Sequence, residues 1–183
     1  MRIISGKFKG KRLLAPKKLP VRPTTDMAKE ALFNIINNLY YFNKINVLDL
    51  FAGTGNVSYE FASRGTENIT AVDANLSCIK FINKTANELG CNISTIKSDV
   101  FKYLENTNAK FDIIFADPPY NFELSKFENI VKLVFKNNLL NNNGLLIIEH
   151  SKHTELKNNK LLSYQKRYGS NMFSFFEKGE EQD

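Results

Sequence analysis

The stretch NVLDLFAGTG, residues 46–55, decides the fold of this chain. It starts as an apolar run typical of a buried strand and closes with Gly53 and Gly55, after which a helical pattern covers 57–64. Glycine lets the backbone approach a ligand closely, and the first turn of a helix has N–H donors without helical partners. The stretch therefore predicts a strand, a ligand-binding loop and a helix. Ser58 stands where a dinucleotide-binding fingerprint has its third glycine, which weakens the case for a nicotinamide cofactor.

Predicted strands and helices alternate along most of the chain. Such alternation predicts a parallel sheet with right-handed crossovers and helices on both faces. A first helix is expected after Thr25, a suitable N-cap. The predicted strands cover 46–51, 69–73, 93–97, 112–116 and 145–149, and the helices between them cover 57–64, 76–89, 100–105 and 127–138.

The end of the chain breaks this alternation. Two strand-like runs, 161–168 and 172–177, are joined through Gly169 and predict an antiparallel hairpin that completes the sheet. We therefore expect a Rossmann-like α/β fold with a mostly parallel seven-stranded sheet. The 183 residues, 43% of them hydrophobic, suffice for one core. A single domain over 1–183 is predicted, with a basic arm at 1–24 and the core at 25–183.

The composition argues against several classes of protein. No apolar run is long enough to cross a membrane, and the N-terminus lacks the apolar segment of a secretory signal, so we expect a cytoplasmic protein. Cys78 and Cys91 lack the spacing of a metal or redox pair, and His150 and His153 have no further metal ligands nearby. We expect inert thiols, solvated or capping histidines, and no bound metal.

Positive charge is concentrated at the N-terminus. The net charge is +6, yet eight Lys and Arg residues precede the first acid, Asp26, so the rest of the chain is slightly acidic. A basic segment on a near-neutral body is typical of a polyanion-binding protein, although a charge run can equally be a solvated tail. Apolar residues between the charges favour an ordered element. Gly6 and Gly10 predict a short β-hairpin with one basic face.

Acidic residues recur near the carboxyl ends of four predicted strands, the edge where open α/β sheets bind ligands. Each acid alone is more often a helix cap or a solvated residue, but four in succession outline a pocket for an adenosine whose reactive end points at Asp117. S-adenosylmethionine fits this pocket, with Asp73 at the ribose, Asp99 at the adenine and Asp49 towards the methionine amine. The predicted cofactor residues are Asp49, Phe51, Ala52, Gly53, Thr54, Gly55, Asp73, Ala74, Asp99, Val100 and Asp117.

The sequence Asp117-Pro118-Pro119-Tyr120 directly follows the predicted strand at 112–116. Proline has no backbone N–H, so the two prolines form a stiff turn whose carbonyls have no local donor. A carboxylate, a carbonyl and an aromatic face thus stand together, and they suit a flat ring that carries an amino group: two acceptors for its hydrogens and a face for stacking. A Pro-Pro turn that only closes a strand is the alternative. These four residues are the predicted catalytic residues.

The chain also resembles a known family nearly from end to end. DPPY is similar to the catalytic motif of methyltransferases that act on amino groups of nucleic-acid bases. More specifically, MRIISG at 1–6, RPTTD at 22–26, EALFN at 30–34, the glycine loop and Tyr168-Gly169 resemble the bacterial small-subunit ribosomal RNA guanine-N2 methyltransferases. Two residues depart from that family's pattern: Asp73 stands where it often has glutamate, and Ser58 where it often has glycine.

This resemblance implies a class I S-adenosylmethionine-dependent methyltransferase that modifies N2 of one guanine in 16S ribosomal RNA. The implied enzyme is a monomer that acts on a 30S subunit or an assembly intermediate. The Asp117 carboxylate and the Pro118 carbonyl are expected to accept the two hydrogens of the amine, and Tyr120 to stack on the base. The chain has no room for a separate recognition domain, so the arm is expected to bind RNA phosphates. The predicted RNA contacts are Arg2, Lys7, Lys9, Lys11, Arg12 and Arg22.

Three other functions stay open at this point. A DNA adenine-N6 methyltransferase shares the DPPY motif, and the missing recognition domain argues against it. A protein-glutamine methyltransferase has a similar motif, typically with asparagine in the place of Asp117. A non-catalytic RNA-binding or ribosome assembly factor on the same fold is the third, and the intact acids at every expected position argue against it.

Overall fold

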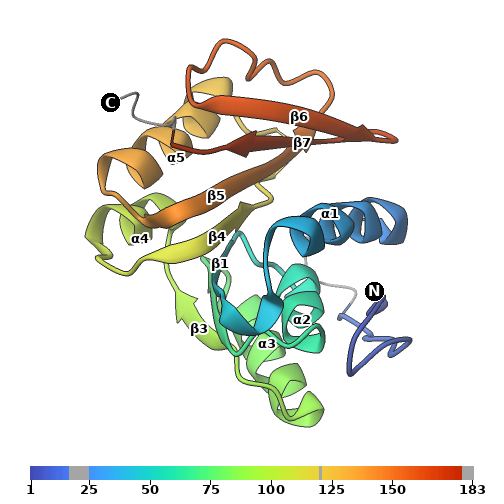
Figure 1. The fold of residues 1–183 in the computed structure, drawn as a ribbon. Helices are drawn as coiled ribbons and strands as arrows, with labels where there is room; N and C mark the ends of the chain where they lie inside the picture. Colours follow the sequence, from blue (N-terminus) through green and yellow to red (C-terminus); the bar gives the residue numbers. More distant parts are fainter. Residues whose placement is uncertain (17–24, 120, 179–183) are drawn as a thin grey trace.

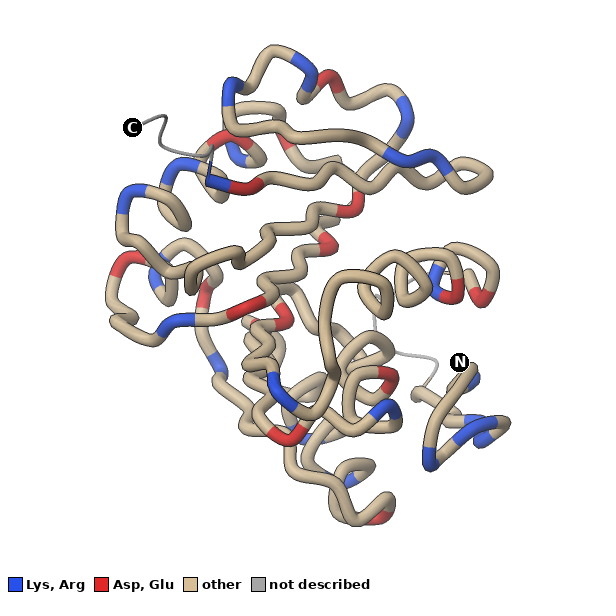
Figure 2. The backbone as a smooth tube through the Cα atoms, in the orientation of Figure 1, with Lys and Arg blue, Asp and Glu red and all other residues tan. Residues whose placement is uncertain are grey.

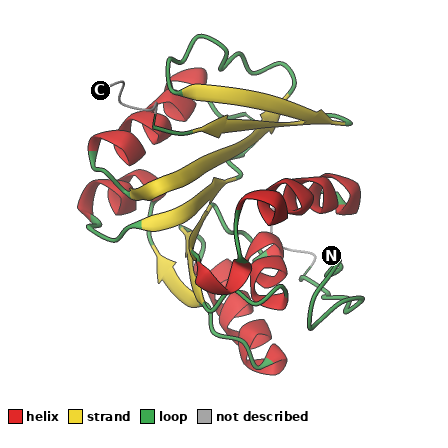
Figure 3. Ribbon diagram, viewed as in Figure 1, coloured by secondary structure: helices red, strands yellow, loops and turns green. Residues whose placement is uncertain are grey.

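A seven-stranded sheet forms the centre of the molecule, with helices on both of its faces (Figures 1 and 3). The computed structural model describes residues 1–16, 25–119 and 121–178. Its strands are β1 (Asn46–Leu50), β2 (Asn68–Asp73), β3 (Ser94–Lys97), β4 (Phe111–Ala116), β5 (Leu140–Ser151), β6 (Leu162–Tyr168) and β7 (Asn171–Phe176). Its helices are α1 (Asp26–Leu39), α2 (Asn56–Ser63), α3 (Leu76–Leu89), α4 (Val100–Asn106) and α5 (Leu124–Lys136), with a short 3₁₀ helix, η1, at Phe42–Lys44.

The order of the strands places a crevice in the middle of the sheet. That order is β3-β2-β1-β4-β5-β7-β6, with β1 to β5 parallel and the last two strands antiparallel. From β1 the chain builds outwards to β3 and then returns to β4 on the other side of β1. At such a reversal the connections leave in opposite directions and open a crevice at the carboxyl ends of the strands. The predicted α/β fold with its C-terminal antiparallel hairpin is confirmed.

Two hydrophobic cores, one on each face, hold the helices to the sheet. On β4, Ile113 and Phe115 pack with α1, α2 and α3, whereas Ile114 and Ala116 pack with α4 and α5. Strands covered on both faces are made of consecutive apolar residues, because side chains of both parities are buried. Successive side chains of a strand point to opposite faces of the sheet, and this also fixes the face to which the residues just beyond each strand point.

β5 is longer than the predicted strand at 145–149. Its register against β4 shifts between the pairs Phe111–Leu140 and Ile113–Leu145, and the strand takes in the asparagines at 141–143. Such a bulge lets polar residues extend a strand without entering the core, which is why hydrophobic patterning did not reveal them.

The N-terminal segment folds back on itself and carries several of the basic residues (Figure 2). Arg2 and Arg12 form an antiparallel bridge, and the N–H of Ile3 donates to Lys11 O at 3.0 Å. The predicted return of the chain is therefore present, but as a single bridge around a turn rather than as two strands. Three further basic residues of the predicted arm lie outside the described residues: Lys17, Lys18 and Arg22.

The turn of this segment packs against the end of α2 as well as pairing within itself. Lys7 N donates to Ser63 O at 2.7 Å, and Phe8 N donates to Ser63 Oγ at 2.9 Å. Gly6 has a φ of +80°, and a Cβ atom there would lie 1.8 Å from Ser63 O. Only glycine permits this approach. The N–H groups of Lys7 and Phe8 thus bond to α2, whereas those of Lys9 and Gly10 bond within the segment, to Gly6 O at 3.1 Å and Ile3 O at 2.8 Å.

A buried cluster of charges anchors the same segment. Lys29 of α1 and Glu60 of α2 are both 0% exposed, and Lys29 Nζ lies 3.5 Å from Glu60 Oε2. Arg64 Nε donates to Glu60 at 2.9 Å, and the N–H groups of Ile4 and Ser5 donate to the same carboxylate at 2.8 and 3.1 Å. Burial lowers the pKa of Lys29, and the Glu60 charge opposes that shift. Glu60 therefore ties the segment, α1 and α2 together, in a place where an unpaired charge is costly.

Candidate functional site

The four predicted strand-end acids lie along the carboxyl edge of the sheet. Because the strand order runs β3-β2-β1-β4, they follow each other as Asp99, Asp73, Asp49 and Asp117. Asp49 pairs in register with Phe115 of β4, so Asp117 lies two residues further along the neighbouring strand and on the same face. The structure thus places Asp49 on β1 and Asp117 directly after β4, the two strands that border the crevice.

The loop between β1 and α2 is held by Asp73. Its carboxylate accepts the N–H of Gly53 at 2.8 Å and the N–H of Asn75 at 2.7 Å. Gly55 has a φ of +79°, and a Cβ atom there would lie 2.9 Å from the ring of Tyr59. Asp73 therefore shapes the glycine loop, a role that the sequence analysis did not assign. A carboxylate can accept further hydrogen bonds at the same time, so this role is compatible with ligand binding.

Ser58, one of the two residues that depart from the pattern of the resembled family, has a side chain that holds Asp49. Asp49 is 2% exposed, and Ser58 donates to its Oδ2 from the hydroxyl at 2.6 Å and from the backbone N–H at 3.2 Å. Burial raises the pKa of Asp49 to about 7, while these two hydrogen bonds lower it. The departure at position 58 thus adds a hydrogen-bond donor to a buried acid.

Replacing Asp49 by asparagine should flatten the pH dependence of stability between about pH 4 and pH 7. The folded protein keeps a proton on Asp49 up to about pH 7, whereas an unfolded aspartate loses it near its ordinary pKa of about 3.9. The folded state then binds more protons than the unfolded state, so the contribution of Asp49 to the free energy of unfolding falls as pH rises through this window and levels off above it. The asparagine retains an oxygen for Ser58.

Urea unfolding of both proteins at a series of pH values measures this effect. We expect the variant to gain stability relative to the wild type as pH rises from about 4 to about 7. A difference between the two proteins that stays constant over that range would contradict the assignment of a raised pKa to Asp49.

The remaining predicted cofactor residues surround the same edge. Asp99 is the N-cap of α4 and accepts the N–H of Lys102 at 3.0 Å. Val100 is 3% exposed, so its side chain belongs mainly to the core. In the glycine loop and at the end of β2, Ala52 and Thr54 are buried and Ala74 is exposed.

A cluster of aromatic rings borders the glycine loop. The rings of Phe51 and Phe122 meet edge to face with centroids 5.5 Å apart, and Phe122 stacks on Phe101 of α4 at 6.1 Å. Phe122 follows the Pro-Pro turn, so the cluster connects that turn to the predicted cofactor loop. Sequence reasoning missed Phe101 and Phe122, because no spacing pattern marks rings that meet from three separate connections.

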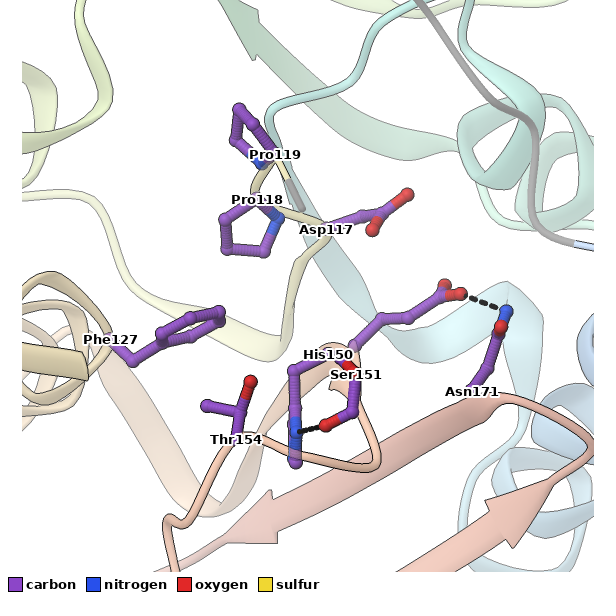
Figure 4. Close-up of a pocket in the computed structure, with 9 residues that line it drawn as sticks. Asp117, Pro118, Pro119, Phe127, His150, Ser151, Thr154 and Asn171 are labelled. Atoms are coloured by element: carbon purple, nitrogen blue, oxygen red, sulfur yellow. Dashed lines mark hydrogen bonds between the residues drawn. The ribbon is translucent and has the colours of Figure 1, made fainter. Parts of the chain in front are cut away.

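A pocket lies beside Asp117, among residues from β5, β7, α5 and the loops after β4 and β5 (Figure 4). The sequence predicted three of its residues, and the fourth catalytic prediction, Tyr120, lies outside the described residues. Sequence reasoning missed the walls from β5 and β7. Glu149 ends an apolar run just as Asp117 follows one, and that signal could have found it. The pocket is lined by Asp117, Pro118, Pro119, Phe127, Glu149, His150, Ser151, Thr154 and Asn171.

Two carboxylates dominate the electrostatics of this pocket. Burial raises the pKa of Asp117 well above its usual range, and the charges of Glu149 and Asp49 raise it further. Among the described residues, no hydrogen-bond donor contacts the Asp117 carboxylate. Glu149 is 6% exposed and accepts the amide of Asn171 at 2.5 Å. The oxygens of Asp117 and Glu149 can accept from a ligand edge that presents several N–H groups, and such donors would favour the ionised form of Asp117 against this shift.

The prediction of a solvated or capping His150 is wrong. Its side chain is 6% exposed, with Nδ1 2.8 Å from Ser151 O and Nε2 2.6 Å from Ser174 Oγ. A carbonyl can only accept, so Nδ1 carries the hydrogen and Nε2 accepts from the serine hydroxyl. Burial lowers the pKa of His150, which favours this neutral form. His153, in contrast, is exposed as predicted.

Within the described ranges, no set of three or more His, Cys, Asp or Glu side chains is arranged to hold a metal ion. In the same part of the chain, none of the helices combines the length and the apolar character needed to span a bilayer.

Nearly the whole chain matches one protein family. The family model described as conserved hypothetical protein 95 covers residues 1–177. The chain belongs to this family. The ribosomal RNA small subunit methyltransferase D of Buchnera aphidicola is 36% identical over 150 residues, which cover 81% of this chain and 75% of the relative.

Solved structures show the same fold. The Escherichia coli protein yhhF has a TM-score of 0.80 at 26% identity, over 96% of each chain. The Thermus thermophilus 16S rRNA N2 methyltransferase RsmC, solved with AdoMet and guanosine, has a TM-score of 0.68 over 88% of this chain and 45% of that chain. Its 20% identity shows a shared fold alone. The fold is that of the class I methyltransferases.

Proposed function

We propose that this protein methylates N2 of a guanine in small-subunit ribosomal RNA, with S-adenosylmethionine as the methyl donor. The observation that carries the proposal is the position of Asp117 and Pro118: they line the pocket, and they directly follow β4, the neighbour of the strand that leads into the glycine loop. Relatives named ribosomal RNA small subunit methyltransferase D support the RNA target, and the class I fold supports the donor.

The carboxyl edge of the sheet has the groups that a bound S-adenosylmethionine, the source of an activated methyl group, would need. Gly53 and Gly55 open the backbone for close approach, and Gly55 has no room for a side chain. Asp73 would accept the ribose hydroxyls while it holds the loop, and Asp99 would accept the adenine amine. Asp49 would lie towards the methionine amine.

Asp117 and Pro118 would act on the guanine amine itself. The lone pair of this amine is delocalised into the ring, which makes the nitrogen a poor nucleophile. When the carboxylate and the carbonyl accept its two hydrogens, the nitrogen is drawn towards tetrahedral geometry and its lone pair becomes available. Rate acceleration then comes from positioning and local electrostatics. Tyr120 would stack on the unpaired base, an interaction worth about 1–3 kcal/mol.

Replacing Lys7, Lys9, Lys11 and Arg12 together by glutamine should weaken RNA binding and flatten its salt dependence. These side chains are exposed on the segment anchored by Glu60. For every phosphate that the variant no longer neutralises, the slope of log K against log salt becomes shallower by about 0.7–0.9. Binding titrations at several salt concentrations measure both changes.

The matched control neutralises four exposed lysines of the opposite helical layer and the loop beside it: Lys102, Lys110, Lys132 and Lys136. It removes the same charge, so a general electrostatic effect would weaken binding equally in both variants. That result would contradict a specific role for the arm.

The rival functions make different predictions. A DNA adenine methyltransferase would modify duplex DNA rather than ribosomal particles. A non-catalytic assembly factor would show no rise in melting temperature with S-adenosylmethionine, whereas a ligand of the native state raises it. We also propose that the protein works without a metal, as a cytoplasmic monomer on a 30S subunit or an assembly intermediate.

Nucleoside mass spectrometry of ribosomal RNA from cells with and without the gene tests the proposed function. We expect one N2-methylguanosine of the small subunit to disappear without the gene. An unchanged set of modified nucleosides would overturn the proposal.

A further inference from the structure

We propose that Glu149 selects guanine by accepting the hydrogen of ring nitrogen N1, next to the amine held at Asp117. The inference rests on the proposed function and adds to it the residue that reads the base. Glu149 was not assigned a role in the sequence analysis, and it lines a pocket where the Pro-Pro turn supplies no N–H donor.

The sheet brings Glu149 to the correct place. The register pairs Ala116 of β4 with Ile148 of β5, so Asp117 and Glu149 are the next residues along two neighbouring parallel strands. Side chains at paired positions of adjacent strands point to the same face. Both carboxylates therefore lie on the face that carries Asp49, and both line the pocket.

Asn171 fixes the orientation of Glu149. It comes from β7, where it pairs with Ser151, two residues beyond Glu149 on β5. Its amide donates to Glu149 Oε1 at 2.5 Å (Figure 4). A carboxylate can accept several hydrogen bonds at once, so a glutamate held in this way can still accept from a base. Its orientation is set before the base arrives, which lowers the entropic cost of recognition.

The donor pattern of guanine fits two adjacent carboxylates. Guanine presents a ring N–H at N1 directly beside the two hydrogens of its N2 amine. Adenine and cytosine also carry an exocyclic amine, but the neighbouring ring nitrogen is an acceptor. An ionised carboxylate has no hydrogen to donate, so Glu149 would face that nitrogen lone pair to lone pair. The pocket thus accepts the edge of guanine and rejects the other two amino bases, because unpaired buried acceptors are costly.

The test compares guanine with 2-aminopurine at the target position of reconstituted small subunits. 2-Aminopurine keeps the amine at C2, but its N1 has no hydrogen. We expect the wild type to prefer guanine in kcat/KM. Glu149→Gln retains an oxygen for Asn171 and can turn its N–H group to N1, so its preference for guanine should fall by about 5- to 150-fold relative to the wild type. The missing O6 of 2-aminopurine affects both enzymes equally and cancels in this ratio.

Glu155→Gln, in the exposed loop after β5, is the matched control and should keep the wild-type preference. A thermal shift with S-adenosylmethionine shows that each variant is folded and binds the cofactor. An equal preference for guanine in wild type and Glu149→Gln, or a wild type that does not distinguish the two bases, would overturn the inference. A wild type that does not methylate guanine N2 at all would instead refute the proposed function.

Discussion

Replacing Asp117 by alanine is expected to lower methyl transfer to guanine by about 10²–10³-fold or more. The carboxylate is proposed to accept a hydrogen of the amine, and no other described side chain occupies its position at the end of β4. Binding of S-adenosylmethionine should remain largely intact, because the glycine loop is held by Asp73 and Asp49 is held by Ser58. Single-turnover transfer rates and cofactor titrations measure the two properties separately.

Stability and a conservative variant control this experiment. Burial raises the pKa of Asp117, and no described donor contacts its carboxylate, so its removal should not destabilise the fold. Asp117→Asn retains one acceptor oxygen and should lose less activity than Asp117→Ala. Near-normal turnover by the alanine variant would end the assignment of Asp117 to the reaction.

Replacing Glu60 by alanine is expected to cost about 3–5 kcal/mol of the free energy of unfolding. The change leaves the Lys29 ammonium, which is 0% exposed, without its ion-pair partner. It also removes the acceptor for the N–H groups of Ile4 and Ser5, so the basic segment should detach from α2. Denaturant unfolding measures the stability, and hydrogen exchange of Ile4 and Ser5 measures the detachment.

An exposed ion pair of the same chain is the control. Lys84 and Glu88 lie 3.8 Å apart on α3, with side chains 75% and 61% exposed. Glu88→Ala should cost at most about 1 kcal/mol, since water replaces the missing partner. In a Glu60→Ala background, Lys29→Met should recover part of the stability by removing the uncompensated charge. A Glu60→Ala cost as small as that of Glu88→Ala would contradict the anchoring role.

The parallel part of the fold was predictable because both faces of the sheet are covered. The consecutive apolar residues in β4 and the glycine pair after β1 leave few alternatives to a parallel sheet covered by helices for a chain of this length. The start of β5 was not predictable, since a bulge hides its asparagines from any hydrophobic pattern. The packing of the N-terminal turn on α2 was missed for another reason: the N–H groups of Lys7 and Phe8 donate to Ser63, which lies far away in sequence.

The site divides in the same way. Acids that directly follow apolar runs, such as Asp73 and Asp117, could be predicted from the sequence and the rule for strand ends. Hydrogen bonds between side chains of different helices and strands could not be predicted in this way. Nothing in the sequence pairs Ser58 with Asp49, or Asn171 with Glu149, because these contacts depend on strand order and register. The sequence shows Glu149 at the end of a strand-like run, but only the pairing of β5 with β4 reveals that it lies beside Asp117.

Mass spectrometry of ribosomal RNA treated with the purified protein and S-adenosylmethionine that carries a CD₃ group tests the central claim most directly. Small subunits from cells that lack the gene are the substrate. We predict one guanosine that gains a trideuterated methyl group on N2, and a gain at least about 10²-fold slower with Asp117→Ala. A label on adenine, on another atom of guanine, or on no nucleoside at all would contradict the account.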